Sequence, residues 1–288
     1  VVKYGSFKVY IFFFYMKKVF VCMLLLLTGF VMAVLQAGNH EKMPSVFYVD
    51  GSVASSGDGL SWETAWKTIT EANTYDLQPG NQVWIKNGVY VEGFYPSRSG
   101  HEVVSLQTGV EINQDKIVFP PGTVLSGIDL EANSGQYYVY VYRSWNSNNG
   151  VFKITGIDQE QRYVLVDHAG LIDEAGVEGD HGFLSASIGR PIVFRNGADE
   201  PQHERVVLDV SSTEINTVAY FSNLNYLIID GLDLTGSRNY GGYHIISSNH
   251  IVITNSRIFD MGTVSHSGAP GILIEGNTTT GPANYNMV

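Results

Sequence analysis

The sequence predicts an all-β protein in which short strands stack in parallel as a solenoid. The segment Tyr226–Leu234 is followed 24 residues later by a second version of itself, His250–Ile258. Within each copy the apolar residues alternate, as in a strand with one buried face. Gly231 and Asn255 fall at the same place in the two copies, and both residue types tolerate the left-handed backbone of a sharp bend. Each copy is therefore interpreted as strand, bend, strand, and the copies as successive coils.

The alternation predicts which side chains point into the solenoid. The expected inward residues are Leu227, Ile229, Leu232, Leu234, Ile251, Ile253 and Ile258. The repeat continues less regularly, because Gly271–Asn277 resembles Tyr243–Asn249 at an offset of 28 residues. In that alignment Ile272 replaces His244, which makes His244 a core histidine. A β-sandwich of short strands is the alternative fold.

The N-terminal 37 residues predict a leader. Residues 1–15 are expected to be non-native upstream sequence, and residues 16–37 a signal peptide with a basic start, an apolar middle and small residues near the end. A transmembrane anchor is the competing interpretation, but Lys17 and Lys18 interrupt the apolar run. At the other end, Val288 arrives in mid-coil, so a C-terminally truncated chain is expected.

The charge is acidic, with a net of −11 from 17 Lys and Arg and 28 Asp and Glu. All the charge before residue 38 is positive, so the remainder carries about −15. Such a surface repels nucleic acid and anionic membranes. It is compatible with Ca²⁺ as a cofactor, because Ca²⁺ prefers carboxylate and carbonyl oxygens, and equally with plain solubility.

Three further segments follow the leader. Residues 38–133 are expected to hold an N-terminal cap and the first coils, including a capping helix over Trp62–Tyr75 with Ser61 as its N-cap. Residues 134–187 break the coil pattern and predict an inserted antiparallel β element. Its tyrosines and Trp145 have the shape to stack on sugar rings, although ordinary packing also explains them. Residues 188–288 are expected to be incomplete β-helix coils.

The front of the chain resembles a known superfamily. The features are Tyr48-Val-Asp50, Gly59-Leu-Ser-Trp62, Ala65-Trp-Lys-Thr-Ile69, Pro79-Gly80 and Gly88-Val-Tyr90. They resemble the N-terminus of secreted right-handed parallel β-helix proteins of the pectate-lyase-like superfamily. The resemblance implies the fold, but the superfamily includes polysaccharide lyases, glycoside hydrolases and non-catalytic surface proteins, so it does not determine the activity.

A lyase acting on uronic acids needs a cation for the substrate carboxylate and a base. Arg257 is expected outward and is the candidate clamp, with Asp230 or Asp260 as a calcium ligand. The alternative is structural, because Arg257 should lie one strand spacing from Asp233 and form an opposite-charge pair.

A hydrolase of this fold needs closely set carboxylates. Asp230 is expected outward and is the catalytic candidate, while His266, in the loop around Gly262–Pro270, is the candidate base. Asp233, Arg238 and Tyr240 are expected to bind substrate.

These observations leave two functions open. The first is a secreted carbohydrate-active enzyme, a lyase or a hydrolase, acting on an extended polysaccharide with or without uronic acids. The second is a non-catalytic glycan-binding or cell-surface β-helix. The expected partner is a polysaccharide, with no nucleic acid, no stable membrane insertion after signal cleavage, and a monomeric state.

Overall fold

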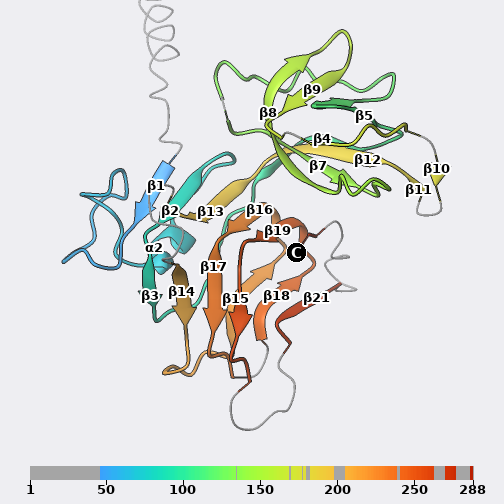
Figure 1. The fold of residues 1–288 in the computed structure, drawn as a ribbon. Coiled ribbons are helices and arrows are strands. Elements are labelled where there is room, and N and C mark those ends of the chain that lie inside the picture. The colour runs from blue at the N-terminus through green and yellow to red at the C-terminus, as the bar shows by residue number, and fades with distance from the viewer. Residues whose placement is uncertain are drawn as a thin grey trace, which may run out of the picture. The chain divides into compact units, whose positions relative to one another are not determined.

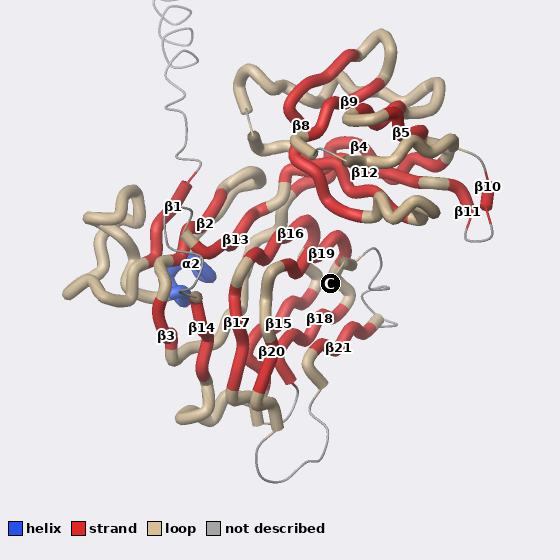
Figure 2. The backbone as a smooth tube through the Cα atoms, viewed as in Figure 1, coloured by secondary structure: helices blue, strands red, loops and turns tan. Residues whose placement is uncertain are grey.

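The structure is a computed structural model that describes residues 46–133, 135–168, 170–176, 178–179, 182–197, 205–238, 241–262, 270–276 and 286–287. All of them belong to one unit of the chain, Ser45–Val288. Strands and loops make up nearly all of this part, with one short helix (Figure 2). No helix within these residues is long and apolar enough to cross a membrane.

Three parallel sheets carry the repeat. Sheet A has the order β1 (Val46–Val49), β2 (Gln82–Ile85), β13 (Ile192–Asn196), β16 (Asn225–Asp230) and β19 (Asn249–Thr254). Sheet B consists of β3 (Gly88–Tyr90), β14 (Val206–Asp209), β17 (Leu232–Thr235) and β20 (Ile258–Phe259), and sheet C of β15 (Thr217–Ser222), β18 (Gly241–Ile246) and β21 (Ile272–Glu275). From β13 onward the chain visits sheets A, B and C in turn, and one such passage is called a coil below (Figure 1).

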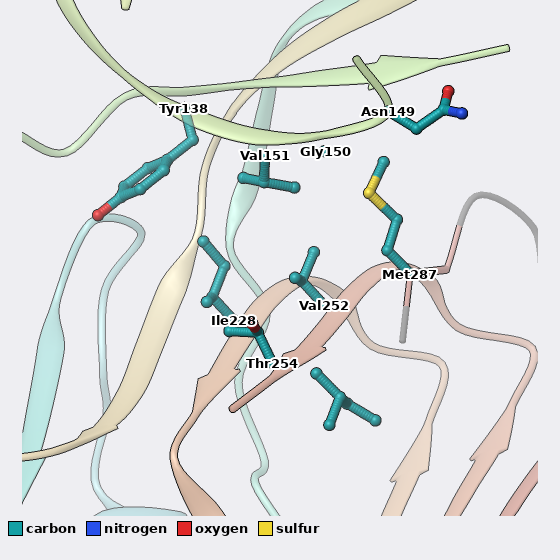
Figure 3. A pocket seen from close by; sticks show the side chains of 9 residues that line it. Tyr138, Asn149, Gly150, Val151, Ile228, Val252, Thr254 and Met287 are labelled. Carbon is teal, nitrogen blue, oxygen red and sulfur yellow. The ribbon is translucent and has the colours of Figure 1, made fainter. Parts of the chain in front are cut away.

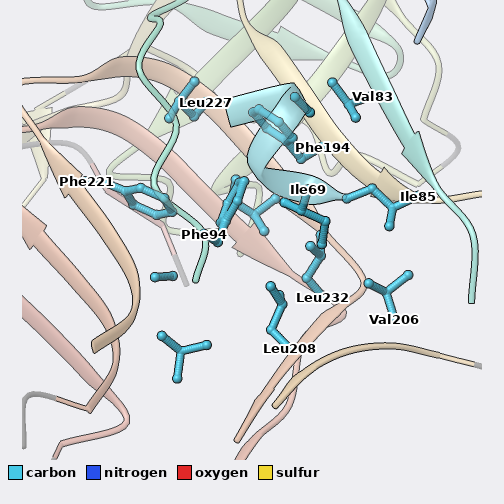
Figure 4. Close-up of a cluster of buried hydrophobic side chains, with 14 of the residues drawn as sticks. Ile69, Val83, Ile85, Phe94, Phe194, Val206, Leu208, Phe221, Leu227 and Leu232 are labelled. Carbon is cyan, nitrogen blue, oxygen red and sulfur yellow. The ribbon is translucent and has the colours of Figure 1, made fainter. Parts of the chain in front are cut away.

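The 24-residue register is confirmed. Leu227 pairs with Ile251, and Leu234 pairs with Ile258. Both bends have the expected backbone, with φ of 79° at Gly231 and 51° at Asn255. The predicted inward residues lie in one buried cluster, with Ile258 packed against it. Figure 4 shows this core, in which side chains from all three sheets meet.

The register expected for the third coil is wrong by one residue. Ile272 pairs with Tyr243, an offset of 29 residues, and His244 pairs with Leu273. A slip of one residue moves every side chain to the other face of a strand. Tyr243 therefore fills the core, and His244 lies on the outer side, where its Nε2 is 2.8 Å from Oε2 of Glu275.

The capping helix is shorter than expected. Helix α2 spans Ile69–Thr74, and its N-cap is Thr68, not Ser61. Thr68 and Glu71 form a reciprocal capping box. Glu92 also accepts hydrogen bonds from the backbone N–H groups of Ile69 and Thr70. Ile69 lies in the same core as sheets A and B, so the helix covers apolar side chains of the first coils (Figure 4).

The inserted antiparallel sheet is larger than expected. Its order is β4 (His101–Thr108), β12 (Ser185–Arg190), β7 (Tyr138–Tyr142), β8 (Gly150–Asp158), β9 (Tyr163–Val166), β6 (Lys116–Val118) and β5 (Glu111–Asn113). A separate hairpin pairs β10 (Glu178–Gly179) with β11 (Gly182–Phe183). The bounds 134–187 thus leave out β4, β5 and β6. These strands have short alternating patterns like those of a coil, and only their pairing with later strands reveals the sheet.

The inserted sheet has its own core, which includes Val139, Val141, Ile154, Val164 and Ile188.

A third cluster joins the inserted sheet to the outer face of sheet A. Tyr226 and His250 stack with ring centroids 4.2 Å apart, and the ring of Tyr140 meets both edge-on. The hydroxyl of Tyr226 donates to Oε2 of Glu102 at 3.0 Å. These contacts cover one part of the outer face of sheet A.

Candidate functional site

The remaining part of that outer face carries a row of polar and aromatic side chains. Strand register places Tyr48 beside Trp84, Trp84 beside Arg195, Arg195 beside Asp230, and Asp230 beside Thr254. Their neighbours along each strand point into the core, so the five residues of this row point outward. Five coils or coil-like passages therefore contribute one side chain each to a single line, which we call the outer row.

Aromatic rings form the first part of the outer row. The ring of Tyr48 meets Trp62 and Trp84 edge-on, at centroid distances of 4.8 and 5.9 Å. Trp62 lies close to the end of strand β13, since a Cβ added to Gly197 would be 3.2 Å from its ring. All three rings are partly exposed. This part of the row offers flat apolar faces with polar edges.

An open ion pair follows the aromatic rings. Nη2 of Arg195 lies 3.8 Å from Oδ2 of Asp230, with 37% and 27% of the two side chains exposed. Asn255 donates a hydrogen bond of 2.7 Å to Oδ1 of Asp230. Nε of Arg195 is buried and has no hydrogen-bond partner within the described residues. Because the contact with Asp230 is long and more than a third of the Arg195 side chain is exposed, the outer guanidinium nitrogens retain donors for a ligand.

A pocket borders this end of the outer row. It has a volume of about 520 Å³ and lies between β7–β8 of the inserted sheet and strands β16 and β19. Figure 3 shows Tyr138 and Val151 on one side of the pocket, with Ile228, Val252 and Thr254 on the other. Burial raises the pKa of Tyr138. The positive charge of Arg195 opposes this shift and the negative charge of Asp230 adds to it, so the phenol lies within electrostatic range of both.

Asp233 is placed as a structural group. Its side chain is fully buried and accepts hydrogen bonds from Arg205 at 2.6 Å and from Arg257 at 2.6 and 2.8 Å. The backbone N–H of Arg257 donates to it at 2.9 Å. Burial alone would raise the pKa of Asp233, but these hydrogen bonds outweigh it and hold the pKa below its ordinary value. Asp233 has no surface with which to contact substrate, and Arg257 is engaged as its partner.

The other predicted site residues are scattered. Arg238 pairs with Glu214, and Asp260 is an exposed residue in the left-handed region with φ of 51°. Tyr240 and His266 lie outside the described residues. The structure therefore brings Asp230 into the outer row and does not bring Arg238 or Asp260 to it.

The calcium hypothesis gains no support from these residues. Nowhere in the described ranges do three His, Cys, Asp or Glu side chains gather as a metal site. Both oxygens of Asp230 already face positive or hydrogen-bonding groups, Asn255 and Arg195. Calcium dependence therefore stays a prediction.

Sequence reasoning missed Trp84 and Arg195, and it considered Tyr138 only as one of the tyrosines of the inserted element. Trp84 and Arg195 occupy outward positions of recognisable strands, and the alternation alone could have found them. Their alignment with Asp230 needs the pairing of β2 with β13 and of β13 with β16, which crosses an insertion of about 90 residues. Tyr138 belongs to the inserted sheet, and no repeat signal places it near the row.

Comparison with known proteins adds little. No family model matches the chain, and no curated protein does. Among solved structures the chain is similar to the tailspike of Pseudomonas phage phi297, with 11% sequence identity and a TM-score of 0.27. The match covers 85% of this chain and 51% of that one, so this chain spans about half of its length. A likeness at this TM-score carries no argument.

Proposed function

We propose that this protein is a secreted right-handed parallel β-helix of the pectate-lyase-like kind and that it binds an extended polysaccharide along the outer face of sheet A. The supporting observation is the outer row. At a strand spacing of about 4.8 Å, its five positions cover about 19 Å in a straight line. A line of that length suits several consecutive units of a polymer better than one small molecule.

The chemistry of the row supports a sugar ligand. Sugar rings have apolar faces of C–H groups and hydroxyls around the edge. The rings of Tyr48, Trp62 and Trp84 supply apolar faces, and Asp230 and Thr254 supply hydrogen-bond acceptors and a donor. Arg195 has the fork of donors that pairs with a carboxylate when the sugar is a uronic acid.

The test is the variant Trp84→Ala. Affinity gels containing polygalacturonate, alginate or a neutral xylan measure binding as retarded migration of the protein. One of these polysaccharides should retard the parent protein. We expect the variant to bind that polysaccharide about tenfold more weakly, because a stacking face is lost. Trp84→Phe keeps a ring and should lose less. Val89→Ala is the matched control, because Val89 is exposed on the outer side of sheet B.

Two outcomes would count against binding at the outer row. One is retention of Trp84→Ala equal to that of the parent on every polysaccharide. The other is equal weakening by Val89→Ala. Urea unfolding of each variant separates lost binding from lost folding.

A polysaccharide lyase is the second candidate, favoured by the position of Tyr138 near Arg195. In such an enzyme Arg195 would hold the uronate carboxylate, and a base would remove the proton from the adjacent carbon. The electron pair left behind would form a carbon–carbon double bond as the glycosidic oxygen leaves and takes up a proton. The unsaturated product absorbs in the ultraviolet. Tyr138→Phe should then abolish the rise in absorbance while leaving retention on the gel unchanged. New reducing ends without that absorbance would indicate hydrolysis instead.

A further inference from the structure

The loop Ser144–Asn149, between β7 and β8, displays an aromatic side chain far from any repeat. Trp145 is 48% exposed. None of the six residues of the loop is charged, and three of them are asparagines. An exposed tryptophan among hydroxyl and amide groups differs from the packing tyrosines of the neighbouring strand β7, of which Tyr140 is fully buried.

Glu174 fixes the first half of the loop. Its Oε2 accepts from Oγ of Ser144 at 2.6 Å, and its Oε1 accepts from the backbone N–H of Trp145 at 2.8 Å. Glu174 is only 9% exposed. Burial alone would raise the pKa of Glu174, but the hydrogen bonds from Ser144, Trp145 and Asn148 outweigh it and lower the pKa. The carboxylate thus holds the backbone of Trp145 in place.

Asn148 fixes the second half. Its side chain is 3% exposed, donates to the carbonyl of Ile172 at 2.8 Å and accepts from the N–H of Ile172 at 2.9 Å. Asn149 accepts from the N–H of Ser144 at 2.8 Å and closes the loop on itself. The loop is therefore preorganised, and a ligand on Trp145 meets little cost for ordering it.

We propose that this loop is a second carbohydrate-binding site, in which an uncharged sugar ring stacks on Trp145 and its hydroxyls meet the amides of Asn146 and Asn149. An aromatic face beside amide groups matches a ring that is apolar on its face and polar on its edge. The six residues carry no charge to pair with a carboxylate, which favours a neutral unit, and the exposed Arg143 lies directly before them. Asn149 also lines the pocket beside sheet A, so one polymer could contact both sites. The loop site stands even if the outer row binds nothing.

Fluorine NMR of the full chain labelled with 5-fluorotryptophan tests the proposal directly. The four tryptophans give four resonances, and Trp145→Phe identifies one of them by its loss. Titrations use cellohexaose, xylohexaose and hexa-galacturonate. We expect the Trp145 resonance to shift with a neutral hexasaccharide and to shift less with hexa-galacturonate. In a Trp84→Ala background, Trp145→Ala should weaken the remaining affinity about tenfold.

The controls separate a sugar site from a protein contact. Val124→Ala removes another exposed side chain, at residue 124 between β6 and β7, and should change nothing. Ile172 is 56% exposed and bonded to the loop, so a protein partner would bury it together with Trp145. Sugar affinity unchanged in Ile172→Ala supports the proposal. A Trp145 resonance that moves with none of the three hexasaccharides overturns it, whatever the effect of Trp84→Ala.

Discussion

Asp230 and Asp233 lie three residues apart, one at the end of β16 and one in β17, and their surroundings are opposite. Asp233 is fully buried and binds two guanidinium groups at hydrogen-bond distance. Asp230 is partly exposed, and its arginine is 3.8 Å away. The bend at Gly231 separates them, with one on sheet A and one on sheet B.

The difference shows what makes a charged pair structural or available. Asp233 is saturated by donors, so it stabilises three neighbouring coils and has nothing left for a ligand. Arg195 and Asp230 attract each other only weakly and keep polar atoms toward solvent. Residue type and alternation are the same in both places, and only the partners differ.

Replacing the buried aspartate should have the largest effect of the substitutions at neutral pH. Asp233→Asn removes the charge and turns amide hydrogens toward two guanidinium groups, so we expect a loss of about 2 to 3 kcal/mol in the free energy of unfolding. Asp230→Asn should cost under about 0.5 kcal/mol. Urea unfolding of both variants measures the contrast. Equal losses would mean that the two aspartates do not differ in the way their contacts indicate.

His250 extends the comparison to the covered part of sheet A. Burial lowers its pKa from 6.5 to about 4. Because the folded pKa lies below the unfolded value, the unfolded chain takes up the proton first. Stability should therefore be complete above about pH 6.5 and fall toward pH 4 by up to about 3 kcal/mol.

The variant His250→Asn isolates this contribution. Asparagine tolerates the left-handed backbone of residue 250, where φ is 57°. Unfolding free energies measured from pH 7 to pH 4.5 should decline less steeply in the variant than in the parent. Parallel curves would show that another group causes the decline.

Gly231 tests the bend that separates the two aspartates. Its φ of 79° is unfavourable for most residues with a Cβ, and Gly231→Ala should cost about 1 kcal/mol. Gly231→Asn should cost less, because Asn255 occupies the same bend one coil later. Thermal unfolding ranks the two variants, and an alanine variant as stable as the parent would show that the bend is not strained.

The smallest effect concerns binding alone. Arg195→Gln should weaken retention on polygalacturonate about fivefold, because one charge-assisted contact is lost. Arg257→Gln is the matched control, since Arg257 is more exposed but engaged by Asp233. Retention lowered by Arg257→Gln and not by Arg195→Gln would move the binding face from sheet A to sheet B.

Several parts of the fold were predictable because they depend on local rules. The 24-residue repeat, the inward residues and the bends at Gly231 and Asn255 follow from alternation and backbone conformation. The register of the third coil was not predictable, because the loop before it changes length. An error of one residue in the register turns every side chain of the strand to the opposite face. The inserted sheet was underestimated because β4 and β12, which pair, lie about 80 residues apart.

The candidate site was likewise predictable only in part. The outward position of Asp230 is a property of its strand, and that of Arg257 follows from its place next to Ile258, which packs against the core. Contacts between coils decide the rest. Through them Asp230 belongs to an open row, whereas Arg257 is engaged by a buried carboxylate.

The sequence by itself therefore determined the parallel coils and which face of each strand is buried, because periodicity acts over a few residues. The tertiary structure alone decided which outward residues align, since strand pairing joins residues that are far apart in the chain. It also decided which charges are saturated, because the partners of Asp233 come from the coils on either side.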